Sequence, residues 1–258
     1  MQTGDITSYI DVAQLVLYAF WVFFAGLIYY LRQEDKREGY PLESDRSRLV
    51  AVQGFPPMPR PKTFLMPHGE KVTVAGGRPD ARPVRAEPIA PWPGAPLEPT
   101  GDPMLDAVGP ASYAQRADVP DHTLDGLPKI VPLRVAGDFY LDPRDPDPRG
   151  MDVVGGDGKI AGRVLEAWVD RSEYLIRYLE MAVHTPEAER RVLIPMNFVR
   201  VDRHRRRVKV RSILSHHFAQ VPTLRDADRV TLLEEERIMA YYGGGTLYAS
   251  AERMGPFL

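Results

Sequence analysis

A run of twenty residues near the N-terminus, Val12–Leu31, is almost wholly apolar and limits the possible folds of this chain more than any other feature. It reads VAQLVLYAFWVFFAGLIYYL, and Gln14 is its one strongly polar side chain. As a helix rising about 1.5 Å per residue, it spans roughly 30 Å, the thickness of the hydrocarbon core of a bilayer. A buried helix of a soluble protein is rarely apolar on every side over this length. We therefore predict that residues 12–31 form a single transmembrane helix.

The charges that flank this segment argue against a cleaved signal peptide and predict its orientation. Signal peptides carry basic residues before a shorter apolar stretch, whereas here Asp5 and Asp11 precede the segment. Arg32, Lys36 and Arg37 follow it, and the positive-inside rule places a basic flank in the cytoplasm. We expect these three side chains to flank the membrane on the cytoplasmic side and the N-terminus to lie on the opposite side.

Proline is concentrated in the part of the chain that follows the apolar segment. Of the 25 prolines, 20 lie between Pro56 and Pro148, and proline excludes long helices because it lacks a backbone N–H and has a fixed φ. Two interpretations of residues 32–128 stay open, a disordered linker and an ordered, extended segment laid over another protein surface. We favour the extended surface region because aromatic residues such as Phe64 and Trp92 recur along it.

Short apolar runs separated by turn residues predict a β domain over residues 129–225. The two longest strands are expected at Gly162–Val169 and Tyr174–Val183. So many short strands with close turns are typical of an antiparallel barrel or sandwich. In the second long strand, the alternation of a regular strand places four side chains on one face: Tyr174, Ile176, Tyr178 and Glu180.

Residues 226–258 predict one further helix and a tail. Asp226 or Asp228 is a candidate N-cap, and the glycine run Gly243–Gly245 is expected to end the helix near Tyr242. The predicted fold class is a single transmembrane α-helix followed by a mainly-β cytoplasmic domain with one C-terminal helix.

Familiar catalytic and metal-binding patterns are missing from the sequence. It contains no cysteine, which excludes disulfides, thiolate metal sites and cysteine nucleophiles. No serine-nucleophile, phosphate-loop or zinc-protease motif occurs, and the turn Gly155–Gly158 lacks the spacing of a dinucleotide loop. A stand-alone enzyme is therefore a distant alternative.

Two charged clusters have both a structural and a functional interpretation. Asp170, Glu173, Arg177 and Glu180 surround one predicted hairpin; such a set is usually a group of surface ion pairs of little energetic value. If a partner covers it, clustered carboxylates can instead hold and pass protons.

The second cluster is the strongly basic segment Arg203–Arg211. A solvated hairpin is the simplest interpretation. Anionic lipid or the acidic face of a partner is the functional alternative, and nucleic acid is disfavoured because no aromatic residues are interleaved with the basic ones.

Motifs along nearly the whole chain resemble one family, the H subunit of the purple-bacterial photosynthetic reaction centre. They occur in the expected order, and together they are highly specific. The motifs are YLRQEDKREGYPL (30–42), PKTFLMPHG (61–69), PTGDPM (99–104), VGPASY (108–113), KIVPLRV (129–135), DPRG (147–150), LEAWVD (165–170), FAQVP (218–222), LEEER (233–237) and AYYGGGTLY (240–248).

The resemblance implies a fold, a location and partners. It implies a periplasmic N-terminus at residues 1–11, one helix across the bacterial inner, intracytoplasmic membrane, and a cytoplasmic β-barrel of the PRC type. This chain itself would bind no pigment. It would cap the L and M subunits, in a complex that carries bacteriochlorophyll, bacteriopheophytin, a carotenoid, a non-haem iron and ubiquinone or menaquinone. Membrane lipids, a cytochrome subunit and a light-harvesting antenna are further partners that it allows; nucleic acid is not one.

The resemblance also implies a role in delivering protons to the secondary quinone of that complex. Asp170 and Glu173 match carboxylates on the path toward the quinone, and Arg177 and Glu180 match neighbouring positions. Asp125 resembles an acidic residue near the point of proton uptake.

One departure from the family concerns this uptake point. Leu127 and Pro128 stand where some relatives have two histidines, so the point of uptake in this chain is left open. A membrane-tethered adaptor, whose β domain binds a different protein partner, is the alternative function.

Overall fold

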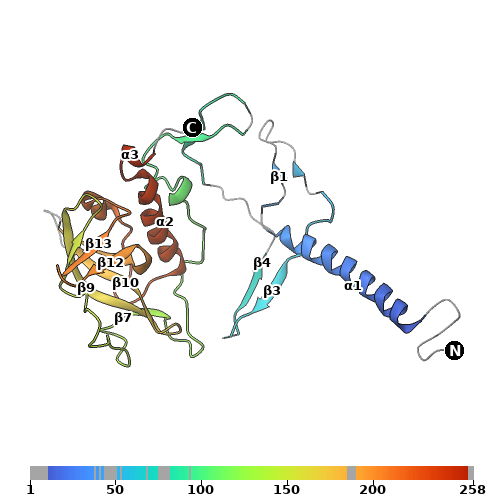
Figure 1. Ribbon diagram of the computed structural model, residues 1–258, viewed down its shortest axis with the longest axis horizontal. Coiled ribbons are helices and arrows are strands. Elements are labelled where there is room, and N and C mark those ends of the chain that lie inside the picture. The colour runs from blue at the N-terminus through green and yellow to red at the C-terminus, as the bar shows by residue number, and fades with distance from the viewer. Residues whose placement is uncertain are drawn as a thin grey trace. The chain divides into compact units, whose positions relative to one another are not determined.

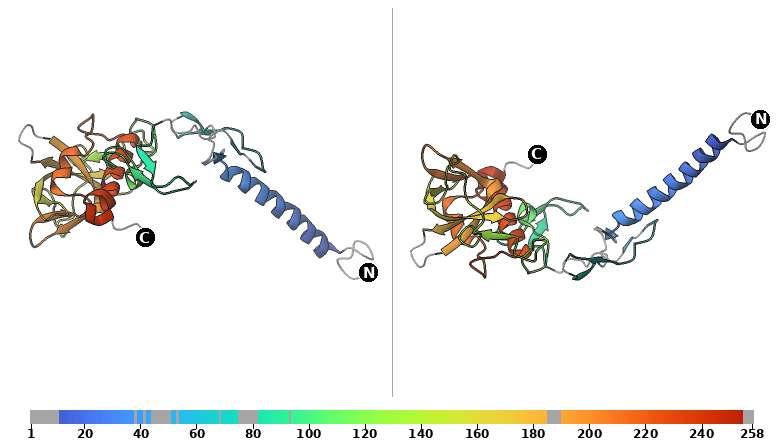
Figure 2. Two further views of the ribbon diagram at one scale, coloured as in Figure 1. Left: turned by 90° about the horizontal axis from the view of Figure 1, so that it is seen from above. Right: turned by 90° about the horizontal axis from the view of Figure 1, so that it is seen from below.

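The computed structural model describes residues 11–37, 39–40, 42–43, 51–52, 54–67, 69–74, 82–92, 94–184 and 190–254. The chain divides into two compact units, Met1–Ala81 with Trp92–Gly94 and Arg82–Pro91 with Ala95–Leu258. Figures 1 and 2 show the elements of each unit. Except for Asp11, the expected periplasmic N-terminus lies outside the described residues, as does the end of the predicted C-terminal tail.

The first unit is built on helix α1, Val12–Asp35. The carboxylate of Asp11 caps the helix by accepting the backbone N–H of Gln14 at 2.7 Å. No residue of the helix is buried, and large apolar side chains such as Trp21 and Phe23 are exposed along it. This surface suits hydrocarbon rather than water, and α1 is long and apolar enough to cross a membrane. The helix continues four residues beyond the predicted span.

Short hairpins follow α1 in the described part of this unit. Strand β1 (Leu42–Glu43) pairs with β2 (Ala51–Val52), and β3 (Lys62–Leu65) pairs with β4 (Lys71–Val74), both antiparallel. Here the chain is extended and forms local hairpins without a further long helix, as its proline content requires.

The second unit begins with the later part of the proline-rich region. Strands β5 (Ala86–Pro88) and β6 (Leu97–Pro99) form a hairpin, and Gly109–Ala111 forms a 3₁₀ turn. The Arg82 guanidinium stacks over the Tyr113 ring at 4.3 Å and donates to the Tyr113 carbonyl at 2.6 Å. Arg237 of helix α2 (Leu232–Tyr248) lies over the same ring at 5.6 Å, so the end of this stretch packs on that helix.

One seven-stranded sheet forms the body of the second unit (Figure 1). Its order is β11-β10-β9-β8-β13-β12, with β7 also paired to β9. The β13–β8 pair is parallel and the others are antiparallel. The ladder is open, with β11 and β12 at its ends. The strands are β7 (Ile130–Pro132), β8 (Asp152–Val154), β9 (Ile160–Asp170), β10 (Leu175–Val183), β11 (Arg190–Pro195), β12 (Val199–Asp202) and β13 (Arg207–Val210).

A large core cluster fills the space between this sheet and helix α2 (Leu232–Tyr248). Leu179, Met181, Ile194 and Val208 from the sheet are fully buried with Tyr242 from α2. Burying large side chains of this kind contributes about 1.5–3 kcal/mol each before the entropy cost. With one apolar N-terminal helix, a mainly-β domain and a C-terminal helix, the predicted fold class is confirmed.

The predicted face of the second long strand needs correction. Ile176 pairs with Val169 and Tyr178 pairs with Trp168, so Arg177 is an extra residue in a β-bulge. Directly paired residues point to the same side, and Val169 and Trp168 are neighbours that point to opposite sides. Ile176 therefore does not share a face with Tyr178. Tyr174 lies outside the strand, in the preceding turn, with a φ of 56°.

The predicted ends of the C-terminal helix were wrong. Helix α2 spans Leu232–Tyr248, and its cap is Thr231 rather than Asp226 or Asp228. Thr231 forms a reciprocal capping box with Glu234: its hydroxyl accepts the Glu234 N–H at 3.1 Å, and the Glu234 carboxylate accepts the Thr231 N–H at 2.9 Å. A short helix, α3 (Ala251–Met254), follows.

The glycine run does not end α2, because its role is close packing. A Cβ on Gly244 would lie 2.5 Å from the Cβ of Ala111, and one on Gly245 would collide with the Ile213 side chain. Glycine here lets the helix approach the 3₁₀ turn and the segment that follows β13, and this contact offsets the low helix propensity of glycine.

Candidate functional site

Asp170 is the most deeply buried charged side chain of the predicted site. It ends β9, where it pairs with Leu175 of β10 and Ile130 of β7, and its side chain is fully buried. Its Oδ1 accepts the backbone N–H groups of Ser172 at 2.9 Å and Glu173 at 3.0 Å. These two bonds shape the β9–β10 turn and fix the carboxylate at its base.

The second oxygen of Asp170 lies between two cations. Its Oδ2 is 3.7 Å from Lys129 Nζ and 3.7 Å from Arg177 Nη2, and it accepts no hydrogen bond from the described residues. Lys129 is also 3.7 Å from Asp121. Two cations thus lie beside this buried carboxyl group, and its Oδ2 is left able to accept a hydrogen bond from a water molecule.

Glu173 and Arg177 lie at the surface beside this buried carboxylate. Glu173 is exposed in the turn, and its side chain forms no ion pair or hydrogen bond with a described residue. The bulge at Arg177 aims its guanidinium back toward Asp170 while leaving the side chain 45% exposed. Three of the predicted residues, Asp170, Glu173 and Arg177, are thus brought together.

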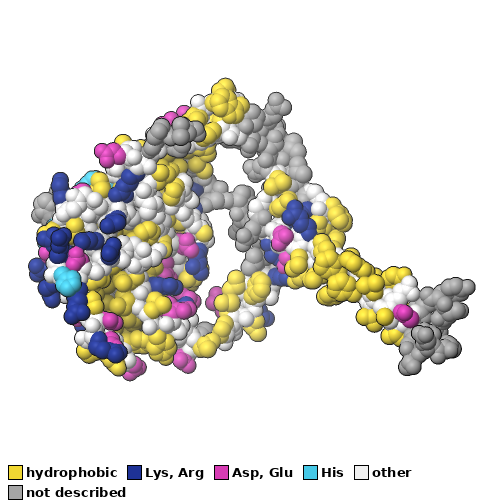
Figure 3. All heavy atoms as spheres, viewed as in Figure 1, with side chains coloured by type: hydrophobic (Ala, Val, Ile, Leu, Met, Phe, Trp, Pro, Cys, Tyr) yellow, Lys and Arg dark blue, Asp and Glu magenta, His cyan; other side chains and the backbone are white. Residues whose placement is uncertain are grey.

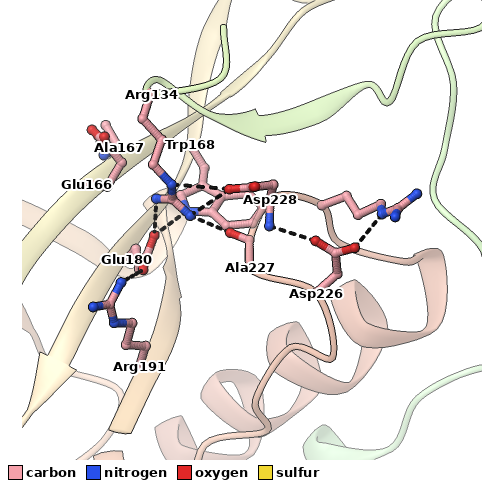
Figure 4. Close-up of polar contacts among 10 residues, drawn as sticks. Arg134, Glu166, Ala167, Trp168, Glu180, Arg191, Asp226, Ala227 and Asp228 are labelled. Carbon is pink, nitrogen blue, oxygen red and sulfur yellow. Dashed lines mark hydrogen bonds and ion pairs between the residues drawn. The ribbon is translucent and has the colours of Figure 1, made fainter. Parts of the chain in front are cut away.

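Glu180 lies in a separate group of ion pairs and hydrogen bonds (Figure 4), and its place on the proton pathway stays a prediction. Its Oε2 accepts from Arg134 Nη1 at 2.9 Å and from the Trp168 indole N–H at 3.1 Å, and its Oε1 lies 3.5 Å from Arg191. Arg134 also pairs with Asp228 at 3.0 Å and donates to the Ala227 carbonyl. Glu180 thus connects β10 to β9, to β11 and to the chain after β7, and Arg134 extends the group to the segment before α2.

Asp125 lies at the exposed tip of the turn that leads to Lys129. The Thr123 N–H donates to the Leu127 carbonyl at 2.8 Å and the Gly126 N–H donates to the Thr123 carbonyl at 3.0 Å, which closes the turn. Asp125 makes no side-chain contact with Asp170. The turn joins them through the backbone of Lys129, whose side chain reaches Asp170.

The predicted membrane-flanking residues lie in the first unit and differ in exposure. Arg32 is exposed and lies 4.0 Å from Asp35. Lys36 is buried: its ammonium donates to the Pro56 carbonyl at 2.5 Å and lies over the Tyr40 ring. These contacts bend the chain back against the end of α1.

Arg37 continues this network beyond the helix. It pairs with Glu34 at 2.9 Å and donates to the Arg60 carbonyl at 3.0 Å. Glu34 also pairs with Lys62, whose ammonium lies 3.2 Å from the Tyr30 hydroxyl. Most of the basic flank is therefore engaged within the protein.

Sequence reasoning missed a partly buried acid on α2. Glu235 accepts the Tyr178 hydroxyl at 2.8 Å, and burial raises the pKa of both groups. They line a pocket of 470 Å³ together with Arg116 and Arg177. In the sequence, Glu235 is the middle of three consecutive glutamates, and only the packing of α2 shows which of them faces the sheet.

Comparison with protein-family models gives two matches that together cover most of the chain. Residues 4–135 match the photosynthetic reaction centre H-chain, N-terminal region. The chain belongs to the H-chain family of photosynthetic reaction centres. Residues 144–216 of this H chain match the PRC-barrel domain, so the predicted barrel type is also confirmed.

Family membership decides between the two functions left open by the sequence. An H chain is a membrane-anchored, structural subunit of a photosynthetic reaction centre, associated with the L and M subunits. The protein is therefore better described as an H chain than as a generic membrane-tethered adaptor. The pigments, quinones, iron, cytochrome and antenna of the complex stay predictions.

Proposed function

We propose that this H chain caps the cytoplasmic face of the L and M subunits and helps to deliver protons to the secondary quinone. The observation that carries the proton role is Asp170, a fully buried carboxylate with one oxygen that accepts no hydrogen bond from the described residues. A quinone that gains two electrons also takes up two protons, and buried carboxylates within reach of water are suited to pass them.

A short relay accounts for the arrangement at the β9–β10 turn. Glu173, which is exposed and unpaired among the described residues, takes a proton from water or from the partner's surface. The buried Asp170 is next to it, tied to the same turn by the Glu173 N–H. Lys129 and Arg177, each 3.7 Å from Oδ2, provide the positive charge that a carboxylate needs in a buried place.

Exposed apolar side chains around the turn support a covering partner. Tyr174 and Tyr140 are more than four-fifths exposed, and the Tyr174 ring packs on Phe139 at 5.3 Å. Leu124 is equally exposed, on the turn that carries Asp125. Apolar surface gathered beside charged groups is typical of a protein interface. Covering it would also dehydrate the carboxylates, as proton storage requires.

The test is the rate of the proton-coupled second reduction of the quinone in the purified complex. Glu173→Gln and Asp170→Asn should each slow the formation of quinol after a second flash, by about tenfold to a hundredfold, since a positioned acid or base contributes at least this much. Glu98→Gln, which alters an exposed carboxylate on β6, is the matched control and should leave the rate unchanged.

Two results would contradict the proposal. Unchanged kinetics in the Glu173→Gln, Asp170→Asn double variant would remove the relay role. Purification of the chain without L and M subunits, or without near-infrared bacteriochlorophyll bands, would remove the capping role. A small permeant weak acid added to the slow variants should restore the rate if proton transfer is the impaired step.

A further inference from the structure

The β12–β13 hairpin carries a concentration of positive charge that the proton relay does not use. Residues 200–211, the basic hairpin, hold seven cations against one carboxylate, a net charge of +6 in a chain whose formal net charge is −2. Figure 3 shows Lys and Arg side chains gathered on this part of the second unit. The cations are Arg200, Arg203, Arg205, Arg206, Arg207, Lys209 and Arg211.

The arginines of the basic hairpin exceed the carboxylates near them: Asp202 acts electrostatically on Arg205 and Asp147 on Arg206. The one carboxylate of the basic hairpin, Asp202, pairs with Lys209 at 2.8 Å. None of the six arginine side chains forms an ion pair or a hydrogen bond with a described residue, and Arg203, Arg205 and Arg206 are exposed at the turn. Concentrated like charge raises the energy of the free protein, so binding an anionic group here is favourable.

The hairpin presents these charges on a rigid support. Val208 and Val210 of β13 are fully buried in the core, and β13 pairs on both sides, with β12 and β8. The Arg205 N–H donates to Asp202 at 3.1 Å and closes the turn. A ligand would therefore lose little free energy in ordering the backbone that carries the cations.

A hollow of 700 Å³ lies between the turn and the loop that precedes β8. Arg144 and Arg149 line it, but each is already bound by an aspartate of its own loop, Asp142 and Asp147, at 2.7 Å. Arg203 and Arg206 line the same hollow and form no ion pair or hydrogen bond with a described residue, although Asp147 attracts Arg206 from a longer distance. They are the two charges that the hollow offers to a ligand.

We propose that the basic hairpin and this hollow form a docking surface for an acidic, carboxylate-rich segment of a partner protein. Six of its seven cations are arginines, whose planar guanidinium groups bind carboxylates in bidentate fashion. The exposed Asp145 also lines the hollow. A continuous layer of headgroup phosphates would be repelled by this carboxylate and could not enter the concave surface, whereas a protein segment can place a basic or neutral residue there.

The experiment measures binding of a fluorescent peptide of alternating Glu and Leu to the full chain in neutral-lipid nanodiscs. The Gln–Leu peptide of the same length is the uncharged probe. The wild-type chain should bind the acidic peptide and not the neutral one. Arg203→Glu with Arg206→Glu should weaken binding by about tenfold or more, the equivalent of about 1.4 kcal/mol or more. The affinity should also fall as salt screens the exposed charges.

Lys159→Glu is the matched control, because it reverses an exposed cation on the neighbouring β8–β9 turn. It should leave peptide affinity unchanged. Equal affinity of the wild type and the Arg203, Arg206 variant would overturn the proposal, as would failure of the wild type to bind at about millimolar peptide. Flotation of the wild-type nanodiscs with phosphatidylglycerol vesicles, without peptide binding, would overturn it in favour of a membrane-facing patch.

The same variants distinguish this surface from the quinone-side cap. The Arg203, Arg206 variant should still assemble with L and M and show normal quinone kinetics, because both side chains are exposed and make no contact with the relay residues. Loss of assembly in this variant would show that the hairpin belongs to the L–M interface and would overturn a separate docking surface.

Discussion

Replacing Glu180 by glutamine tests whether the buried charge cluster of Figure 4 holds the second unit together. The carboxylate is only 5% exposed and accepts from both Arg134 and Trp168. Breaking a fully buried ion pair from one side costs about 3–5 kcal/mol. The Arg134 side chain is 35% exposed, so water compensates part of this loss, and glutamine keeps one acceptor oxygen. We expect the free energy of unfolding to fall by about 2 kcal/mol.

A double-mutant cycle with Arg134→Met isolates the interaction itself. Each single variant removes the Glu180–Arg134 contact and leaves the remaining charge with only its other partner, Asp228 for Arg134 and Arg191 for Glu180, whereas the double variant removes both charges. The double variant should therefore lose about 1–2 kcal/mol less than the sum of the two singles. The exposed pair Asp142–Arg144 has a similar distance, 2.7 Å, and provides the control. Asp142→Asn should cost less than about 0.5 kcal/mol because solvent screens that pair.

The assay is urea unfolding of the full chain in detergent, followed by tryptophan fluorescence. Trp168 is 1% exposed and donates to Glu180, so its emission reports the cluster directly. Replacing Trp21 and Trp92 by phenylalanine in the background removes the other two signals. A coupling energy near zero, with unchanged Trp168 emission in Glu180→Gln, would refute the structural role and return Glu180 to the candidate proton path.

Two further predictions concern the hairpin turn and the helix packing. Lys209 and a backbone N–H lower the pKa of Asp202 to about 2; the stability that this pair adds is present above pH 3.8 and lost as the pH falls toward 2. Lys209→Met should raise the Asp202 pKa in an NMR titration, and an unchanged value would show that the pair is absent in solution. Gly244→Ala should lower the thermal midpoint, at a cost of about 1–3 kcal/mol from the collision with Ala111. Gly137→Ala, where a Cβ meets nothing within 4 Å, should leave the midpoint unchanged, and equal midpoints in the two variants would contradict the packing argument.

Parts of the candidate site were predictable because they depend on local sequence. Asp170 and Glu173 flank a turn between two strands, and a carboxylate in that position commonly accepts the N–H groups that follow it, as it does here. The bulge at Arg177 has no local signal in the sequence. An extra residue in a strand can be recognised only when the strand is aligned with the partner strand to which it is hydrogen-bonded. For the same reason the sequence could not show that Glu180 faces Arg134, which lies 46 residues earlier.

The two ends of helix α2 also differ in how far the sequence predicts them. Thr231 and Glu234 have the spacing of a capping box. This local signal predicts the start of the helix better than the N-cap candidates upstream, Asp226 and Asp228. The end of α2 was not readable locally, because Gly243–Gly245 is a helix stop by propensity and a packing surface in the fold. Likewise, nothing local distinguishes Glu235, which Tyr178 holds, from Glu236, which pairs with Arg116.

By itself, the sequence determined the apolar helix, the mainly-β character of the second half and the family. It also showed the two segments in which charged residues are concentrated, residues 170–180 and 203–211. These follow from composition, periodicity and motif order, which act over neighbouring residues. Only the tertiary structure decided which charges are buried, which are paired and which are free, because burial and pairing depend on side chains brought together from distant parts of the chain. The position of one Asp170 oxygen between Lys129 and Arg177 is a result of that second kind. So is the exposure of Arg203, Arg205 and Arg206 at the turn of the basic hairpin.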